Sequence, residues 1–234
     1  MALRINAADY LDYLDLWLQH LPAAELSQMI SNPLQAVVLC VDVINGFCTT
    51  GPLASTRVAG IVPPITHLFR LAYGLGIRYY LLPQDTHDPQ AVEFATYPPH
   101  CLRGDVQSET APELLQLPFA GSFVIIEKNS ISSSENTALD GWVAQHPQVN
   151  TFIVTGDCTD LCTYQLALHL RLRANARQLA DVRVIVPADC VQTFDTPVHV
   201  AKQLGIPPHP ADLLNAVFLH SMASNGVEIY SHLE

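Results

Sequence analysis

The chain has 234 residues, of which 49% are apolar, and this composition is enough for one large domain with a sizeable core. Its 22 acidic residues outnumber 11 Lys and Arg and give a formal net charge of −11, which disfavours nucleic acid and anionic membranes as partners. We find no apolar run of about 18 residues and no basic N-terminal region, so we expect neither a membrane span nor a signal peptide. Six cysteines in such a chain are typical of cytoplasmic thiols.

The first 35 residues are predicted to form a helical extension, because leucines in residues 8–30 recur near helical spacing. We expect residues 36–234 to form a single domain, since no repeat or linker divides them. Apolar runs that suit buried strands occur at 36–42, 77–83, 122–128, 151–156 and 182–188, with a weaker run at 226–231. Helix-like segments lie at roughly 57–74, 109–117, 135–146, 160–178, 196–204 and 210–223. This alternation predicts an α/β fold with three α/β/α layers around a roughly six-stranded parallel sheet.

Reactive side chains stand at the ends of four of these predicted strands. They are Asp42 after the first, Asp85 and His87 after the second, Lys128 after the third, and Cys158 and Cys162 after the fourth. Each alone has an ordinary explanation, such as a helix cap, a solvated lysine or a small buried thiol. Ligands of open α/β sheets bind beyond the carboxyl ends of the strands, where all these residues meet. Their joint occurrence therefore predicts a catalytic site at that edge of the sheet.

Cys162 is the candidate nucleophile. We expect a helix to begin near Thr159 or Asp160, both good N-cap residues, which puts Cys162 in the first helical turn. The helix dipole and a nearby Lys128 are expected to lower the pKa of the thiol, and Asp42 could take its proton as a general base. First-turn N–H groups could hold an oxyanion. Together these groups suit attack on a carbonyl carbon.

A metal site is predicted beside this thiol. Asp85 and His87 are two residues apart, so they face the same side of an extended chain, and His100 returns after a loop. Glu93 lies between the two histidines and is a further candidate ligand. One carboxylate and two imidazoles leave coordination positions open, as catalytic metal sites require. We expect one divalent ion, zinc in the first place, with iron or manganese as alternatives.

Five motifs follow one another in a specific order: VDVINGFC (41–48), DTH (85–87), YPPHC (97–101), Lys128 and GDCTDLC (156–162). In this combination, from about residue 36 to the C-terminus, the chain resembles the nicotinamidases, metal-dependent members of the isochorismatase-like cysteine hydrolases. The stretches NGFCTTG (45–51) and TFDTPVHVAK (193–202) are similar to the plant-type branch of that family. The resemblance implies the three-layer fold and a metal-dependent amidohydrolase.

The resemblance also implies a role for each matching position. The catalytic triad would be Asp42 as base, Lys128 as charge partner and Cys162 as nucleophile. The metal ligands would be Asp85, His87 and His100, with Glu93 as a further ligand in some members. The backbone amides of Cys158 and Cys162 would form the oxyanion hole after a cis peptide bond, and Phe47 and Tyr97 would flank the substrate ring. Asp157 departs from the family, because a small apolar residue usually stands there.

The resulting hypothesis is hydrolysis of nicotinamide to nicotinate and ammonia through a thioester on Cys162, by a cytoplasmic enzyme that forms a homo-oligomer. The metal ion would bind the pyridine nitrogen and align the carboxamide. One alternative is a related cysteine hydrolase that acts on another small amide, a carbamoyl or ureido compound, although such relatives generally lack the metal triad. A remote alternative is a non-catalytic metal- or redox-responsive protein that uses Cys158 and Cys162. Redox pairs, however, favour two intervening residues rather than three.

Overall fold

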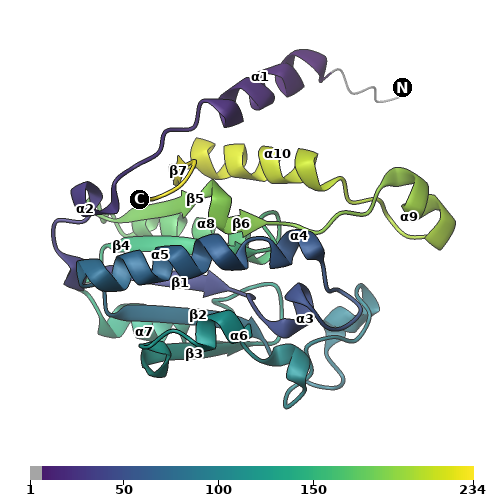
Figure 1. The fold of residues 1–234 in the computed structure, drawn as a ribbon, viewed down its shortest axis with the longest axis horizontal. Helices are drawn as coiled ribbons and strands as arrows, with labels where there is room; N and C mark the ends of the chain where they lie inside the picture. Colours follow the sequence, from purple (N-terminus) through teal and green to yellow (C-terminus); the bar gives the residue numbers. More distant parts are fainter. Residues whose placement is uncertain (1–6) are drawn as a thin grey trace.

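A parallel β-sheet forms the centre of the molecule in the computed structural model, which describes residues 7–234 (Figure 1). Its strands are β1 (Ala36–Val41), β2 (Tyr79–Asp85), β3 (Phe123–Lys128), β4 (Thr151–Asp157), β5 (Arg183–Pro187), β6 (Val191–Gln192) and β7 (Glu228–Tyr230). They lie in the order β3-β2-β1-β4-β5-β7, with parallel neighbours, and the short β6 pairs with β4. The predicted α/β fold is confirmed, with seven strands in place of about six.

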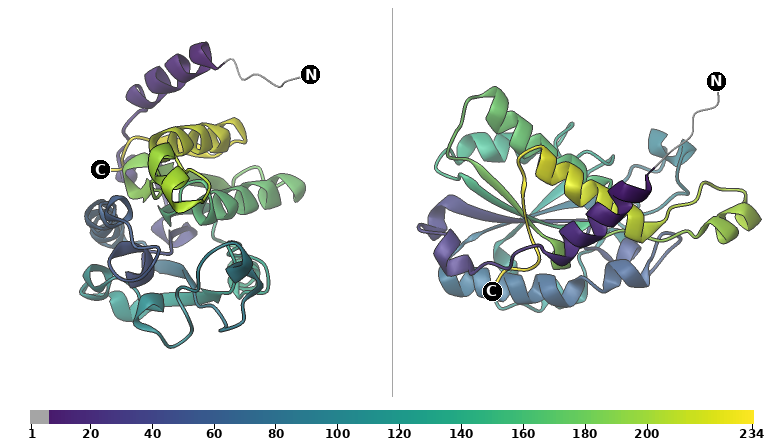
Figure 2. Two further views of the ribbon diagram at one scale, coloured as in Figure 1. Left: turned by 90° about the vertical axis from the view of Figure 1, so that its right-hand side faces the viewer. Right: turned by 90° about the horizontal axis from the view of Figure 1, so that it is seen from above.

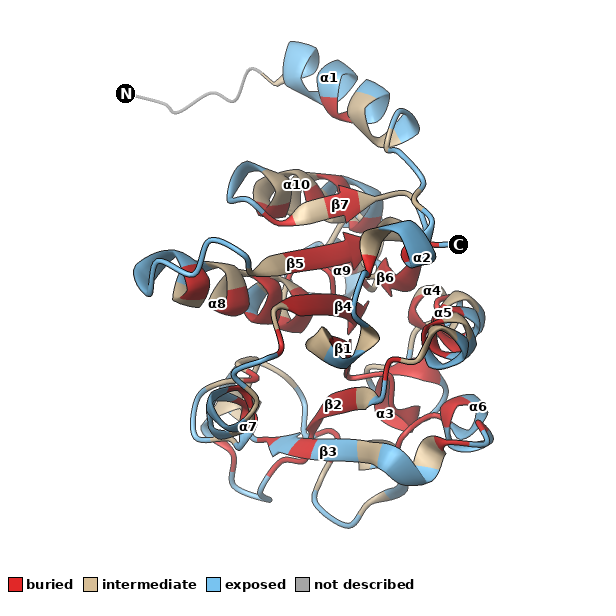
Figure 3. Ribbon diagram, turned by 90° about the vertical axis from the view of Figure 1, so that its left-hand side faces the viewer, coloured by how far each residue is buried: buried red, intermediate tan, exposed pale blue. Residues whose placement is uncertain are grey.

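Helices cover both faces of this sheet (Figure 2). They are α1 (Ala8–Gln19), α2 (Leu26–Met29), α3 (Asn45–Cys48), α4 (Thr56–Ala59), α5 (Val62–Leu75), α6 (Pro112–Leu115), α7 (Leu139–Gln145), α8 (Cys162–Ala176), α9 (Val198–Leu204) and α10 (Ala211–Ser224). Helices α5 and α6 lie on one face, and α7, α8 and α10 lie on the other (Figure 3). Within residues 7–234, none of these helices combines the length and apolar character that crossing a membrane requires.

β1 is buried on both faces because its side chains alternate between two separate cores. Val38 and Cys40 belong to the core that includes α5. Val37, Leu39 and Val41 belong to the core that includes α7, α8 and α10. A strand with apolar residues on both faces suits the interior of a parallel sheet that is covered on both sides. This pattern explains why β1 lies at the centre, where the polar residue that follows it is also shielded from water.

β3 differs from β1 because it is the edge strand of the sheet. Its sequence, FVIIEK, predicts burial on both faces, but Val124 and Ile125 are 41% and 45% exposed (Figure 3). The prediction of a strand is right, whereas that of complete burial is wrong. The physical reason is that an edge strand has a neighbour on one side only, which an apolar run alone does not reveal.

Two predicted helical segments are each divided in the structure. Residues 57–74 form α4 and α5, because Pro63 and Pro64 lack an N–H donor and are tolerated only in the first turn of a helix, where α5 begins. Residues 8–30 form α1 and α2, and α1 packs against α10, where Tyr13 and Trp17 contact the ring of His220. The division into an extension and a domain stays a prediction, and residues 1–6 of that extension lie outside the described residues.

The strand order reverses between β1 and β4, which are neighbours at the centre of the sheet. In open α/β sheets, ligands bind at the carboxyl ends of the strands at such a point. Asp42 directly follows β1, and Asp157 is the last residue of β4. Gly156, with φ of +116°, allows the close approach of the two strands, since a Cβ atom there would lie 2.0 Å from the carbonyl oxygen of Val41.

Candidate active site

Asp42 is held in place by contacts with the neighbouring strand β2. Its N–H donates to the carbonyl of Pro83 at 2.9 Å, and its Oδ1 accepts from the N–H of Asp85 at 2.8 Å. Its φ of 57° lies in the left-handed region, which aspartate tolerates better than most residues. Because Asp42 is 0% exposed, its carboxylate is both fixed and shielded from water.

Lys128, the last residue of β3, contacts the other members of the predicted triad. The strand register pairs it with Asp85. Its Nζ lies 2.7 Å from Oδ2 of Asp42, 2.5 Å from Oδ1 of Asp85 and 3.6 Å from Sγ of Cys162. The structure therefore brings Asp42, Lys128 and Cys162 together around one buried ammonium group, while their catalytic roles stay a prediction.

The charges in this cluster depend on one another. Burial and the nearby Asp85 raise the pKa of Asp42 to about 6, although Lys128 counteracts them. Burial disfavours the charged form of Lys128, but the two carboxylates keep its pKa well above its usual value. Burial also raises the pKa of Cys162 well above its usual value, and Lys128 offsets only part of this effect. The expected lowering of the Cys162 pKa is therefore wrong, because desolvation outweighs the ammonium and the helix terminus.

Helix α8 begins at Cys162 itself and has no side-chain cap. The predicted cap at Thr159 or Asp160 is wrong, since the Asp160 carboxylate is engaged elsewhere. It accepts hydrogen bonds from Oγ1 of Thr193 at 2.6 Å and from Nε2 of His209 at 2.8 Å. These partners come from a segment more than thirty positions further along the chain, so local sequence gives no sign of them.

Cys158 and Cys162 direct their sulfur atoms at different partners. Sγ of Cys158 lies 3.8 Å from Oδ2 of Asp157, whereas Sγ of Cys162 faces Lys128. All six cysteines are free, and the Asp157–Cys158 peptide bond is cis. Within residues 7–234, the amides of Cys158 and Cys162 donate no hydrogen bond. Both N–H groups are therefore available to an oxyanion, and the two thiols do not form a redox pair in this structure.

Asp85, His87 and His100 form a buried cluster whose ligand atoms all lie within 4.8 Å of one another. The Nε2 atoms of His87 and His100 lie 3.4 and 3.8 Å from oxygens of Asp85. Their Nδ1–H groups donate to Oδ1 of Asn129 at 3.1 Å and to the carbonyl of Pro98 at 2.8 Å. This leaves the Nε2 lone pairs facing a carboxylate, and Nε2 of His87 has no hydrogen-bond partner among residues 7–234. Such an arrangement fits a divalent metal ion.

Glu93 stands near this cluster without belonging to it. Its carboxylate accepts a hydrogen bond from the N–H of Ile131 at 3.1 Å. It lines the same cavity as Asp85 and His100, but it is not among the atoms that meet within 4.8 Å. Its role as a further metal ligand stays a prediction.

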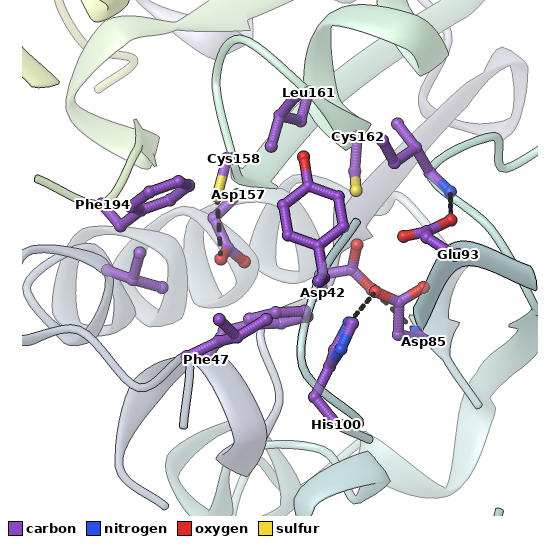
Figure 4. Close-up of a pocket in the computed structure, with 14 residues that line it drawn as sticks. Asp42, Phe47, Asp85, Glu93, His100, Asp157, Cys158, Leu161, Cys162 and Phe194 are labelled. Carbon is purple, nitrogen blue, oxygen red and sulfur yellow. Dashed lines mark hydrogen bonds and ion pairs between the residues drawn. The ribbon is translucent and has the colours of Figure 1, made fainter. Parts of the chain in front are cut away.

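One cavity connects the thiol with the metal cluster (Figure 4). The predicted site residues that line it are Asp42, Phe47, Asp85, Glu93, Tyr97, His100, Cys158 and Cys162, while His87 and Lys128 lie buried behind its wall. The wall also includes residues to which the sequence assigned no role, Leu53, Val58, Ile131, Leu161 and Phe194. Two of them had a usable signal, because Leu161 lies in the GDCTDLC motif and Phe194 in the TFDTPVHVAK stretch.

Three comparisons relate this chain to known proteins. A family model described as "Isochorismatase domain" matches residues 36–204. Nicotinamidase 1 of Arabidopsis thaliana is 31% identical over 231 residues, which cover 92% of this chain and 93% of that protein. A cysteine hydrolase of Pseudomonas syringae pv. phaseolicola is similar in fold, with a TM-score of 0.68 and 24% identity over 85% of this chain and 89% of that one. The pyrazinamidase of Pyrococcus horikoshii in complex with zinc is also similar, with a TM-score of 0.64 and 20% identity over 83% of this chain and 98% of that one.

Proposed function

This chain belongs to the isochorismatase-domain family, and we propose that it is an amidohydrolase that converts nicotinamide to nicotinate and ammonia, with Cys162 as its nucleophile. The observation that carries the proposal is the meeting of three groups beside one cavity: a thiol, a buried ammonium and a carboxyl with a pKa of about 6. A cluster that fits a metal ion lies at the same cavity. The 31% identity to an Arabidopsis nicotinamidase supports the choice of substrate.

The first half of the reaction transfers the acyl group to sulfur. Asp42 takes the thiol proton of Cys162 while the sulfur bonds to the carboxamide carbon. This transfer is short, because Sγ and the carboxylates of Asp42 and Asp85 lie within 4.8 Å of one another. The amides of Cys158 and Cys162 hold the oxyanion. Asp42 then gives its proton to the amide nitrogen, the C–N bond breaks, and ammonia leaves a thioester behind.

The second half returns the enzyme to its starting state. Water attacks the thioester carbon while Asp42 takes one of its protons. The C–S bond then breaks, nicotinic acid leaves, and the sulfur of Cys162 regains the proton from Asp42. The released acid gives its remaining proton to ammonia or water and becomes nicotinate. Lys128 keeps its charge throughout and stabilises whichever neighbour is anionic. A base with a pKa of about 6 suits both directions of transfer, because it can hold or release a proton near neutral pH.

Asp85, His87 and His100 would hold the metal ion, and we propose zinc, because one carboxylate with two imidazoles suits it. When bound, the ion supplies a Lewis-acidic position for the ring nitrogen of the substrate. The similarity to a pyrazinamidase solved with zinc supports this choice. The rings of Phe47 and Tyr97 lie 5.6 and 6.3 Å from that of His100, where they can flank a planar substrate.

The metal cluster also favours nicotinamide over the alternative of a carbamoyl or ureido compound, which offers no ring nitrogen. We propose a cytoplasmic location, which the six free thiols support. We propose a homo-oligomer as well, and the exposed apolar residues Val124 and Ile125 on the edge strand support it.

Ammonia and nicotinate release from nicotinamide tests the proposal directly. We expect equal amounts of both products from the wild-type protein. Cys162→Ala should lower kcat/KM by at least about a thousandfold, because it removes the nucleophile. Cys190→Ala is the matched control, since it removes a buried thiol that does not line the cavity. Full activity in Cys162→Ala would overturn the mechanism.

Metal analysis of the purified protein tests the cluster. We expect about one divalent ion per chain in the wild type, and a loss of both metal and nicotinamide turnover in His100→Ala. His199→Ala, which changes an exposed histidine outside the cavity, should keep both. Turnover of an N-carbamoyl amide that survives chelation, without turnover of nicotinamide, would favour the alternative substrate.

A further inference from the structure

The carboxyl group of Asp157 has no role in this reaction, although it lies in the wall of the cavity. The residue is 1% exposed, and its Oδ1 has no hydrogen-bond partner within the described chain. In Figure 4 its carboxyl is directed into the space between the labelled residues, beside Cys158 and across the cavity from Glu93. A buried polar atom without a partner lowers the stability of the fold. Its presence here therefore points to a ligand atom that satisfies it.

The backbone fixes this side chain at the cavity. Asp157 pairs with Gln192 of β6, and the preceding Gly156 lies against Val41 with no room for a side chain. The other oxygen, Oδ2, lies 3.8 Å from Sγ of Cys158, a weak donor. Only Oδ1 is thus left without a partner.

The charge state of Asp157 makes Oδ1 a hydrogen-bond donor. Burial, together with the nearby Asp42, raises the pKa of Asp157 well above its usual range, and Lys128 offsets only part of this. This shift favours the neutral, protonated carboxyl. Because Oδ2 faces the thiol of Cys158, the proton lies on Oδ1, and a protonated carboxyl in an apolar site is a good donor.

Within the described chain, no group accepts a hydrogen bond from Oδ1 of Asp157. The wall of the cavity also contains Phe47, Leu53, Val58 and Phe194, whose side chains are apolar. Nicotinamide has two polar groups, the ring nitrogen and the carboxamide, and the proposed mechanism uses both, at the metal cluster and at the thiol. When unsubstituted nicotinamide is bound, the hydrogen bond from Oδ1 of Asp157 can therefore go only to a water molecule.

We propose that Asp157 is a specificity-determining residue of this site, and that its Oδ1 donates a hydrogen bond to an acceptor atom on the ring of the substrate. This inference rests on the proposed amidohydrolase function and narrows its substrate class. The site then takes heteroaromatic carboxamides whose ring carries an additional oxygen-containing substituent, such as an ether or a hydroxyl group. A site that binds such a group disfavours analogues in which an apolar group of equal size replaces it.

The test compares methoxy- with ethyl-substituted nicotinamides, which match in size and differ in one acceptor oxygen. The pairs carry the substituent at ring position 4, 5 or 6, and kcat/KM is measured for each. For at least one position, the wild-type protein should prefer the methoxy compound by about tenfold, the value of one good hydrogen bond. Asp157→Leu, close in size and apolar, should lower that preference to about twofold or less, and Asp157→Asn, which keeps a donor, should retain most of it.

Asp157→Ala is a second apolar variant in case the leucine protein does not fold, and it should behave in the same way. Equal preference in the wild-type, leucine, alanine and asparagine proteins would overturn the inference. So would a wild-type preference for the ethyl compounds at every position. Turnover of unsubstituted nicotinamide by the wild type is measured separately. Its absence counts against the proposed function, while a methoxy preference that depends on Asp157 still supports the inference.

Discussion

Buried aspartates stand at the carboxyl ends of β1, β2 and β4, but their electrostatic surroundings differ. Asp42 and Asp85 share the ammonium of Lys128, at 2.7 and 2.5 Å. Asp157, among the described residues, forms no ion pair. Burial opposes ionisation in every case. Lys128 and the histidines outweigh it at Asp85 and lower its pKa, whereas Lys128 offsets only part of it at Asp42, whose pKa is raised to about 6. The pKa of Asp157 is raised well above its usual value.

The difference shows that the charged neighbours of a buried carboxyl, together with its burial, decide what the carboxyl can do. With a cation nearby, the carboxyls of Asp42 and Asp85 can be anionic, which suits proton transfer and metal binding. Asp157 forms no ion pair within the described chain, and its raised pKa favours a neutral carboxyl that can donate a hydrogen bond to a polar atom. One edge of a single sheet thus combines a charged region with a neutral polar one.

The largest effect is expected when the shared cation is removed. Lys128→Met removes the ammonium that the buried carboxylates of Asp42 and Asp85 share, which should lower the free energy of unfolding by about 3–5 kcal/mol. It should also abolish nicotinamide turnover, because Asp42 and the thiol of Cys162 then lose the cation that stabilises their anionic forms. Urea unfolding and an ammonia assay measure the two effects. Lys202→Met, at an exposed lysine of α9, is the matched control and should change the stability by less than about 1 kcal/mol.

A double variant shows whether Lys128→Met lowers stability through unpaired buried charge or through lost packing. Adding Asp42→Asn to Lys128→Met removes one of the two buried negative charges that have lost the ammonium. About 1–2 kcal/mol of the lost stability should therefore return, while the enzyme stays inactive. If the second substitution lowered stability further by an independent amount, the carboxylates would not be the source of the cost.

Asp157→Asn should have an effect that depends on pH. The folded pKa of Asp157 lies above the unfolded value of about 3.9, so the folded protein keeps a proton that the unfolded chain releases. The stability of the wild type therefore falls as pH rises between these two values, by up to about 1.4 kcal/mol per pH unit. Asparagine does not titrate. The stability of Asp157→Asn relative to wild type should thus increase from pH 5 to pH 8, and a constant difference would contradict a neutral Asp157.

The sequence was sufficient to predict the sheet and the reactive residues at its edge, because buried strands are short apolar runs whose carboxyl ends meet. It was not sufficient to predict the surroundings of those residues. The apolar run of β3 looks like that of β1, although Val124 and Ile125 are exposed at the edge. A single chain contains no direct signal for the order of strands.

Electrostatic partners were predicted least well, since they depend on contacts between distant segments. The helix dipole and Lys128 led us to expect a lowered pKa at Cys162, whereas full burial raises it. Asp160 looked like an N-cap, but its partners Thr193 and His209 lie 33 and 49 residues away. Helix and capping propensities depend on neighbouring residues in the sequence, so they cannot predict partners that are distant along the chain.

His209 forms a partly buried ion pair, which is intermediate between the fully paired Lys128 and Asp157, which forms no ion pair within the described chain. Its two ring nitrogens face the Asp160 carboxylate and the carbonyl of Phe194, both at 2.8 Å, so only the charged imidazolium satisfies both acceptors. Burial opposes that charge, but Asp160 raises the pKa of His209, and His209 in turn helps to lower that of Asp160. The stabilisation by His209 is therefore complete below its unfolded pKa of about 6.5 and is lost as pH rises through the folded value.

His209→Phe should test this pair, since it keeps an aromatic ring against Phe194, which stacks on His209 at 3.8 Å. We expect a loss of about 1–2 kcal/mol at pH 5.5, where Asp160 is ionised, and a smaller loss at pH 9. Urea unfolding at both pH values measures it, with His199→Phe at an exposed histidine as control. An equal loss at both pH values would show that His209 contributes packing rather than charge.

The smallest effect is expected at Asp212, which also pairs with a cation but lies at the surface. Its carboxylate is 2.6 Å from Arg57, and its side chain is 92% exposed. The distance is about that of the Lys128 contacts, yet water screens the charges, so Asp212→Asn should cost less than about 1 kcal/mol and less still in 0.5 M salt, about the concentration at which screening acts within a few ångströms. The same salt should leave the cost of Lys128→Met almost unchanged, because that cluster is buried. If salt reduced both costs equally, burial would not be what separates the buried pair from the exposed one.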